Sequence, residues 1–259
     1  MNSQSSPMLL SVNDPPPVQI HNTHGASPFL LIGDHAGNTI PLSLGTLGLT
    51  DAEMGSHIGW DIGIGGLGER LSAALDAVFI RQTYSRLVID CNREPGAPDA
   101  MPEVSDKTLV PANQGLGEAA RAARVDEIHA PYHAAIASEL ARRDAAGIDT
   151  ILVALHSFTP AMQGVPRPWQ IGILHSGGDA SFALALLRGL QERGEMTVGD
   201  NQPYAMDGID YTVPRHAFEA RRRYAEIEIR QDLLATGEQQ AGWSELLAVM
   251  LTAAASHSE

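Results

Sequence analysis

Beyond residue 28, short apolar runs of β-type composition alternate with longer segments of helical periodicity, and no other feature constrains the fold as strongly. Strands that alternate with helices are typical of a mostly parallel, mixed sheet with helices on both faces. The sequence therefore predicts an α/β fold. The expected strands are residues 29–33, 78–82, 87–91, 151–155, 170–174 and 225–230. The expected helices are residues 67–77, 117–143, 181–193 and 243–254.

The length of 259 residues favours a single domain, because α/β chains of this size often form one core. We expect residues 1–28, which include three consecutive prolines, to be a mobile or surface-bound arm. The domain itself is expected over residues 29–259. Two local features are also expected: Pro131 kinks or splits the second helix, and residues 94–117 form a long loop that could cover a site.

Charge and composition exclude several classes of function. The chain has 17 Lys and Arg against 31 Asp and Glu, and the net charge of −14 opposes binding to nucleic acid or to an anionic membrane surface. No apolar run approaches the roughly 18 residues that span a bilayer, and no signal peptide is recognisable, so we expect a cytoplasmic protein. Because Cys91 is the only cysteine, a metal ion would have to be held by His, Asp, Glu or Asn.

Two histidines follow apolar strands at the sheet edge where α/β proteins bind their ligands. His35 comes just after the strand expected over residues 29–33, and His156 just after the strand expected over residues 151–155. Each alone would also suit an ordinary hydrogen-bonded histidine. Two of them at neighbouring strand ends favour a zinc site.

A catalytic zinc ion typically takes three protein ligands and leaves a fourth position for water, so a third side chain is needed. The candidates are Asp61, His57 and Asn38. We prefer Asp61, because a carboxylate is a harder ligand than an amide. Asp61 would otherwise be a helix cap or a turn residue.

Glu228 is a candidate general base. It alternates with isoleucines in the strand expected over residues 225–230, so Glu226, Glu228 and Arg230 share one face. On an edge strand this face would be a Glu–Arg ladder in water. Facing a zinc ion, Glu228 would accept a proton from the bound water.

Several arginines are candidates for binding anions. Asn92 and Arg93 follow the strand expected over residues 87–91 and could serve an oxyanion or a carboxylate. Arg86 and Arg167 are further candidates for a substrate carboxylate. Each of the three arginines would equally suit an ordinary surface ion pair.

Two other motifs lack the context that their usual functions require. Residues 63–68 fit the G-x-G-x-x-G pattern of dinucleotide-binding proteins, but no strand is expected immediately before them. His129 and His133 stand four residues apart, but no glutamate follows His129 as a zincin would require. A dinucleotide-dependent oxidoreductase and a metal-free binding protein remain the alternative functions.

The order of the candidate residues resembles that of the zinc carboxypeptidase superfamily: a first histidine, an Asn-Arg pair, a His-Ser pair and a Glu-Ile-Arg triplet. The resemblance to the N-formylglutamate amidohydrolase family is closer and runs from about residue 28 to residue 235. The matching blocks are residues 34–41, 85–93, 131–133, 156–160, 167–169 and 201–204.

This resemblance implies a single-domain zinc hydrolase that cleaves the linear amide bond of a small N-acyl amino acid, such as N-formylglutamate. By position it makes His35 and His156 zinc ligands and Glu228 the catalytic base. We further expect Arg93 to stabilise the oxyanion, and we expect Asn92, Arg86, Arg167 and Ser157 to bind the substrate. The chain departs from the relatives at two places. Asn38 stands where carboxypeptidases have a glutamate ligand, and Ala36 where members acting in histidine degradation usually have serine.

Overall fold

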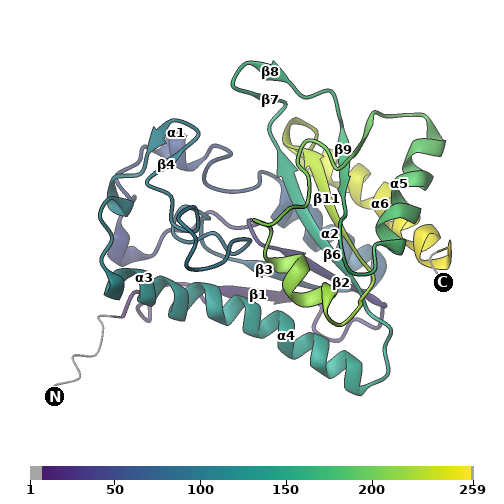
Figure 1. The fold of residues 1–259 in the computed structure, drawn as a ribbon, viewed down its shortest axis with the longest axis horizontal. Helices are drawn as coiled ribbons and strands as arrows, with labels where there is room; N and C mark the ends of the chain where they lie inside the picture. Colours follow the sequence, from purple (N-terminus) through teal and green to yellow (C-terminus); the bar gives the residue numbers. More distant parts are fainter. Residues whose placement is uncertain (1–7, 258–259) are drawn as a thin grey trace.

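The structure is a computed structural model that describes residues 8–257, and a seven-stranded sheet runs through its middle (Figure 1). The strand order is β1-β3-β2-β6-β11-β9-β10. The bounds are β1 (Val18–His21), β2 (Phe29–Gly33), β3 (Val78–Gln82), β6 (Ile151–Phe158), β9 (Ile171–Leu174), β10 (Val198–Asp200) and β11 (Tyr224–Arg230). The four central strands β3, β2, β6 and β11 are parallel, while β1 and β9 each pair antiparallel with their central neighbour. The expected mixed, mostly parallel α/β sheet is confirmed.

Helices cover both faces of this sheet (Figure 1). The α-helices are α1 (Asp51–Met54), α2 (Ile64–Leu75), α3 (Glu118–Arg124), α4 (Ala130–Ala145), α5 (Ser181–Arg193) and α6 (Gly237–His257). One face packs against α2, α5 and α6, and the other packs against α4 and the π-turn at Pro214–Phe218. Side chains alternate between these two cores along each strand. Along β11, Ile227 and Ile229 enter the first core, so Glu226 and Glu228 point to the opposite face.

Five of the six expected strands are present, and the strand expected over residues 87–91 is wrong. These residues form turns: the Val88 N–H bonds to the Ser85 carbonyl over 2.9 Å, and the Asp90 N–H bonds to the Ala100 carbonyl over 2.8 Å. Leu87, Val88 and Ile89 are buried in a third apolar cluster built by loop segments beside the sheet. The run was apolar because it fills this cluster, and hydrophobicity alone does not distinguish the two environments.

The segment expected to be an arm contributes a strand to the sheet. Residues 1–7 lie outside the described residues, but Val18–His21 forms β1, which pairs antiparallel with β3 at the sheet edge. The preceding prolines are fixed as well, since the Tyr84 hydroxyl donates to the Pro15 carbonyl over 2.6 Å. The described part of this segment is therefore built into the α/β domain.

The long helix expected over residues 117–143 is interrupted. A π-turn at Val125–His129 separates α3 from α4, and it ends just before Pro131 in the first turn of α4. Proline lacks an N–H group and fits the first turn of a helix, so the wider turn before it accommodates the break in hydrogen bonding. The interruption lies where Pro131 predicted it.

The glycine-rich residues 63–68 serve the packing of α2. They are preceded by α1 and by turns, so no strand leads into them. A Cβ atom on Gly68 would lie 2.3 Å from the Phe79 ring, and one on Gly65 would lie 2.5 Å from Arg81 Nη1. Glycine is needed at residue 68 because α2 approaches the Phe79 ring of β3 closely, whereas the Arg81 side chain could move away from a larger residue 65.

The loop expected over residues 94–117 carries a two-stranded hairpin, β4 (Val104–Ser105) and β5 (Thr108–Leu109). A second hairpin, β7 (Ala161–Met162) and β8 (Val165–Pro166), follows β6 and projects from the body of the molecule (Figure 1). Both hairpins supply side chains to the cavity described below. Among residues 8–257, no helix combines the length and the apolar character needed to cross a membrane.

Candidate active site

A cavity of about 720 Å³ opens at the carboxyl ends of β2 and β6. His35 lies just past the end of β2. His156 lies in the C-terminal half of β6, on the face away from α2. Asp61 comes from the loop before α2, where its backbone N–H donates to the His35 carbonyl over 2.9 Å. Pairing of β2 with β6 thus brings together side chains that are far apart in the sequence.

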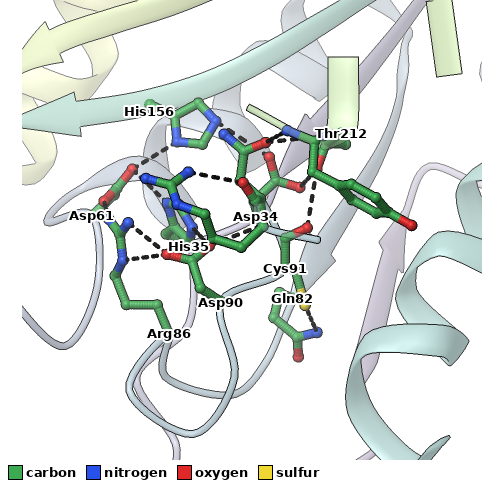
Figure 2. A network of polar contacts seen from close by, with 12 residues as sticks. Asp34, His35, Asp61, Gln82, Arg86, Asp90, Cys91, His156 and Thr212 are labelled. Carbon is green, nitrogen blue, oxygen red and sulfur yellow. Dashed lines mark hydrogen bonds and ion pairs between the residues drawn. The ribbon is translucent and has the colours of Figure 1, made fainter. Parts of the chain in front are cut away.

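His35, Asp61 and His156 form one buried group (Figure 2). Asp61 Oδ2 lies 3.0 Å from His156 Nδ1 and 3.5 Å from His35 Nδ1. One ligand atom from each residue lies within 4.8 Å of the others, and no side chain of the three is more than 5% exposed. In residues 8–257 this is the only such group of histidine, cysteine and acidic side chains.

Two further carboxylates lie at the outer nitrogens of the histidines. Asp90 Oδ1 accepts a hydrogen bond from His35 Nε2 over 2.7 Å, and Asp34 Oδ2 lies 3.3 Å from His156 Nε2 (Figure 2). The Arg86 guanidinium in turn donates two hydrogen bonds to Asp90 Oδ2, from Nε over 3.1 Å and from Nη2 over 2.6 Å. Carboxylates placed in this way orient metal-binding histidines. Sequence reasoning missed both acids, although Asp34 directly precedes His35.

The residues of this group fit a divalent metal ion. An ionised carboxylate only accepts hydrogen bonds, so Asp90 fixes a proton on His35 Nε2 and leaves a lone pair on Nδ1. This buried Nδ1 has no hydrogen-bond partner in the described part of the chain, although it faces Asp61. With neutral imidazoles, the carboxylates of Asp34, Asp61 and Asp90 and the Arg86 cation give a net charge of −3 + 1 = −2. A divalent cation would neutralise this charge, and two imidazole nitrogens with one carboxylate are ligands that zinc accepts.

The electrostatic field at the group favours positive charge. Burial opposes the ionisation of Asp61, yet His35 and His156 hold the pKa of Asp61 below its ordinary range. Burial also opposes the ionisation of Asp90, but Arg86 holds its pKa well below the ordinary value. Burial lowers the pKa of His156, whereas the acids on both sides of its ring raise it well above the usual value.

The other two candidates for the third ligand lie elsewhere. Asn38 donates from Nδ2 to the Met54 carbonyl over 2.7 Å, so its amide supports a neighbouring loop. His57 Nε2 lies 3.2 Å from Asp106 Oδ2 at the cavity wall. Neither side chain belongs to the buried group around Asp61.

Glu228 stands beside this group. The parallel register of β11 and β6 places Glu228 opposite His156. Glu226 and Glu228 are only 2% and 6% exposed, so the alternative of a ladder in water is wrong for these two acids. Arg230 pairs instead with Asp232 at 2.8 Å. Burial raises the pKa of Glu228 to about 8, and its Oε2 has no hydrogen-bond partner in residues 8–257.

Asn92 and Arg93 line the cavity. They follow residues 87–91, which form turns where a strand was expected. The Arg93 Nε donates to Asp99 over 2.8 Å, and its Nη1 donates to the Asn92 carbonyl over 2.8 Å. The Asn92 side-chain oxygen accepts the backbone N–H groups of Tyr211 and Thr212 over 3.0 and 2.9 Å. The Asn92 amide is therefore engaged in holding a second loop against the site.

Ser157 and Arg86 are likewise engaged with the protein. The Ser157 hydroxyl donates to the Ile62 carbonyl over 3.0 Å, and its backbone N–H donates to Asp61 Oδ2 over 3.2 Å. Arg86 pairs with Asp90, and its Nη1 lies 3.5 Å from Asp61 Oδ1. Both residues border the cavity, but their polar groups fix the acids around the histidines.

Arg167 lies next to the cavity without an acidic partner in the described chain. Its Nη1 donates to the Tyr204 hydroxyl over 3.0 Å and to Thr159 Oγ1 over 3.2 Å. The guanidinium also stands 4.8 Å from the centre of the Tyr204 ring. Tyr204 and Thr159 both line the cavity, so this cation is placed at its border.

His129 and His133 do not join the buried group. His133 Nε2 donates to the Cys91 carbonyl over 2.9 Å, which leaves His133 Nδ1 to accept from His216 Nε2 over 3.0 Å. Burial lowers the pKa of His133 to about 3. His129 Nε2 bonds to the Arg93 carbonyl over 3.1 Å. Both histidines are thus hydrogen-bonded to backbone carbonyl groups outside the buried group. This agrees with the absence of the glutamate that would follow His129 in a zincin.

Comparison with known proteins identifies the class and then the family. The family-model match places the chain among the amidohydrolases, a class of enzymes that hydrolyse amide bonds. The chain belongs to the N-formylglutamate amidohydrolase family, whose model matches residues 27–235. No curated protein sequence matches the chain significantly.

Two crystal structures are among the solved structures that resemble this one. The gene product Atu2144 from Agrobacterium tumefaciens is 37% identical over 96% of this chain and 98% of its own, with a TM-score of 0.92. The N-formylglutamate amidohydrolase from Ralstonia eutropha JMP134 is 21% identical over 93% of this chain and 98% of its own, with a TM-score of 0.67. The second likeness shows that the fold is shared.

Proposed function

We propose that this protein is a zinc-dependent amidohydrolase that cleaves the acyl group from an N-acyl amino acid. The expected acyl group is formyl. The observation that carries the proposal is the buried His35, Asp61 and His156 group beside the unpartnered Glu228. Membership of the N-formylglutamate amidohydrolase family supports the same reaction.

His35 and His156 would hold the metal ion through Nδ1, and Asp61 would hold it through its carboxylate. Asp90 and Asp34 keep the two rings oriented through the outer nitrogens. When bound, zinc supplies Lewis-acid chemistry that acidifies water and polarises an acyl carbonyl.

Glu228 acts as the general base and then as the general acid. Its carboxylate accepts the proton of the attacking water as the oxygen adds to the acyl carbon. It then returns this proton to the amide nitrogen as the C–N bond breaks, so the products are a carboxylic acid and a free amine. Its position opposite His156, with one oxygen unpartnered, suits this transfer.

The arginines have different roles in the proposed reaction. Arg93 stabilises the developing oxyanion, because its Nε and Nη1 contacts fix the guanidinium at the cavity wall. Arg167 binds the substrate carboxylate, since it is a cation beside the cavity without an acidic partner in the described chain. Arg86, Asn92 and Ser157 support the site through the contacts described above.

The test combines metal analysis with hydrolysis. Elemental analysis of the purified protein is expected to give one zinc per chain, and zinc-loaded enzyme is expected to release amine from N-formyl amino acids. His35→Ala and His156→Ala should each lose the metal on mild dialysis, whereas His129→Ala should retain it. Full zinc content in both of the first two variants, or no hydrolysis of any N-formyl or N-acetyl amino acid, would overturn the proposal.

A further inference from the structure

We infer that the cavity contains a subsite for a cationic group of the substrate, formed by Glu226 and Asp210. The preferred substrates are then N-acyl amino acids whose side chain carries an ammonium or guanidinium group, rather than N-formylglutamate. This inference rests on the proposed function and specifies its substrate class.

The charges around the cavity are strongly unbalanced. Eight carboxylates line it, against two arginines in its lining, Arg86 and Arg93, and a third, Arg167, at its border. The two lining arginines are already paired with acids, Arg86 with Asp90 and Arg93 with Asp99. The cavity would therefore repel a second carboxylate on a substrate side chain and attract a cation.

Most of the acids have partners within the protein. Asp61 and Asp90 belong to the histidine group, Asp99 pairs with Arg93, and Asp106 pairs with His57. Glu228 is assigned to proton transfer. The acids that remain are Glu226, Asp210 and Asp207.

Of these three acids, Glu226 is the buried one. It is 2% exposed, it borders the cavity, and its Oε2 has no hydrogen-bond partner in residues 8–257. It lies two residues before Glu228 on the same face of β11, about 7 Å further from the carboxyl end of the strand. An unpartnered buried carboxyl group costs free energy, and the proposed proton transfer does not use it. A ligand that donates hydrogen bonds would provide the missing partner.

Asp210 faces the same region from the loop after β10. Glu226 and Asp210 both line this cavity. Burial and repulsion by Asp210, against attraction by His156, raise the pKa of Glu226 to about 8. Asp210 accepts the Asp207 N–H over 3.1 Å and the Asn92 Nδ2 over 3.4 Å. It forms no ion pair within the described residues, because the nearby Arg93 is bound to Asp99.

A substrate cation would relieve this repulsion. An ammonium or guanidinium group between Glu226 and Asp210 would donate charge-assisted hydrogen bonds to both carboxylates. Arg167, beside the cavity at Tyr204, would hold the substrate carboxylate. The cavity then recognises a zwitterionic N-acyl amino acid, with its acyl group near Glu228 and its cationic side chain at Glu226.

Hydrolysis of different substrates by the wild type and by variants, at matched zinc content, tests the subsite. The wild-type enzyme is expected to hydrolyse N-formylarginine or N-formyllysine with a kcat/KM at least tenfold higher than N-formylglutamate. Glu226→Gln and Asp210→Asn should each lower the ratio of kcat/KM for N-formylarginine over N-formylleucine by about tenfold. Glu192→Gln, an exposed acid on α5, is the control and should keep the wild-type ratio.

A binding measurement separates this inference from the proposed function. Titration calorimetry with free arginine and free glutamate requires no hydrolysis, and only arginine should bind, more weakly to Glu226→Gln and Asp210→Asn. A preference for N-formylglutamate, or equal binding of both amino acids, would overturn the cationic subsite while leaving the amidohydrolase intact. Absence of hydrolysis with selective arginine binding would overturn the proposed function instead. Because Asp210 is in a loop, its variant decides the question if Glu226→Gln does not fold.

Discussion

Asp90 accepts a hydrogen bond from Nε2 of His35 over 2.7 Å, and this contact determines that Nδ1 of the ring faces Asp61. The same carboxylate accepts a hydrogen bond from the Arg86 guanidinium. Because Arg86 lines the cavity, the orientation of the His35 ring is linked to the cavity wall. A histidine fixed in this way presents one defined lone pair, which is the property that metal binding requires.

Asp90→Asn is expected to weaken zinc binding by about 10-fold to 100-fold. The amide is nearly the same size as the carboxylate, but it removes the negative charge that makes His35 a stronger ligand and that pairs with Arg86. Competition against a chelator of known affinity measures the change. Asp232→Asn, at an exposed ion pair with Arg230, is the matched control. Equal zinc affinity of the two variants would contradict the role of Asp90.

Asp61→Ala is expected to abolish stable zinc binding, because it removes a ligand and leaves two histidines. Asn38→Ala and His57→Ala should keep close to one zinc per chain, since neither side chain reaches the buried group. Elemental analysis after dialysis measures all three variants in parallel. Zinc retention in Asp61→Ala, with loss in either of the other two, would reassign the third ligand.

Glu228→Gln is expected to lower kcat on N-formyl amino acids by about 10²-fold to 10⁴-fold, the usual contribution of a general base. The amide keeps the size of the side chain but cannot accept the proton from water. Zinc should remain bound, because Glu228 is not one of the ligands. Glu245→Gln, at an exposed position on α6, should have the wild-type kcat. A kcat for Glu228→Gln within threefold of wild type at equal zinc content would exclude Glu228 as the base.

Glu139→Gln is expected to destabilise the fold at pH 7 by about 1–3 kcal/mol, the range for hydrogen bonds to charged groups. Glu139 Oε1 accepts from Nε of the fully buried Arg143 over 2.7 Å. Contact with Arg142, and then with Arg143, lowers the pKa of Glu139 below 4.5. A lowered pKa in the folded state means that this stability is present above pH 4.5 and is lost as the pH falls below it.

Urea unfolding at a series of pH values tests this prediction. The difference in unfolding free energy between wild type and Glu139→Gln should shrink from pH 7 towards pH 3. Glu192→Gln, which removes an exposed acid from α5, should show little difference at any pH. A Glu139→Gln difference that stays constant across this range would mean that the ion pair with Arg143 is not its source.

Much of the fold was predictable because its signals are local. The strands β2, β3, β6, β9 and β11 are apolar runs bounded by turns, and the helices α2, α5 and α6 overlap the segments where helices were expected. The strand expected over residues 87–91 was not predictable in this way, because its side chains are buried by loops from elsewhere in the chain. β1 was missed because an edge strand beside prolines carries a weak apolar signal.

The sequence by itself indicated the α/β class, His35 and His156 as candidate ligands, and Glu228 as the candidate base, because residue type and strand position are local properties. It favoured Asp61 as the third ligand but left His57 and Asn38 as alternatives. Only the tertiary structure decided which groups meet. It brought Asp90 and Asp34 to the outer nitrogens of the histidines, turned Arg86 towards Asp90, and left Glu226 Oε2 buried without a hydrogen-bond partner in the described residues. These outcomes depend on strand order and loop packing. Both determine the distances between residues that are far apart in the sequence, and a local sequence pattern carries no information about such distances.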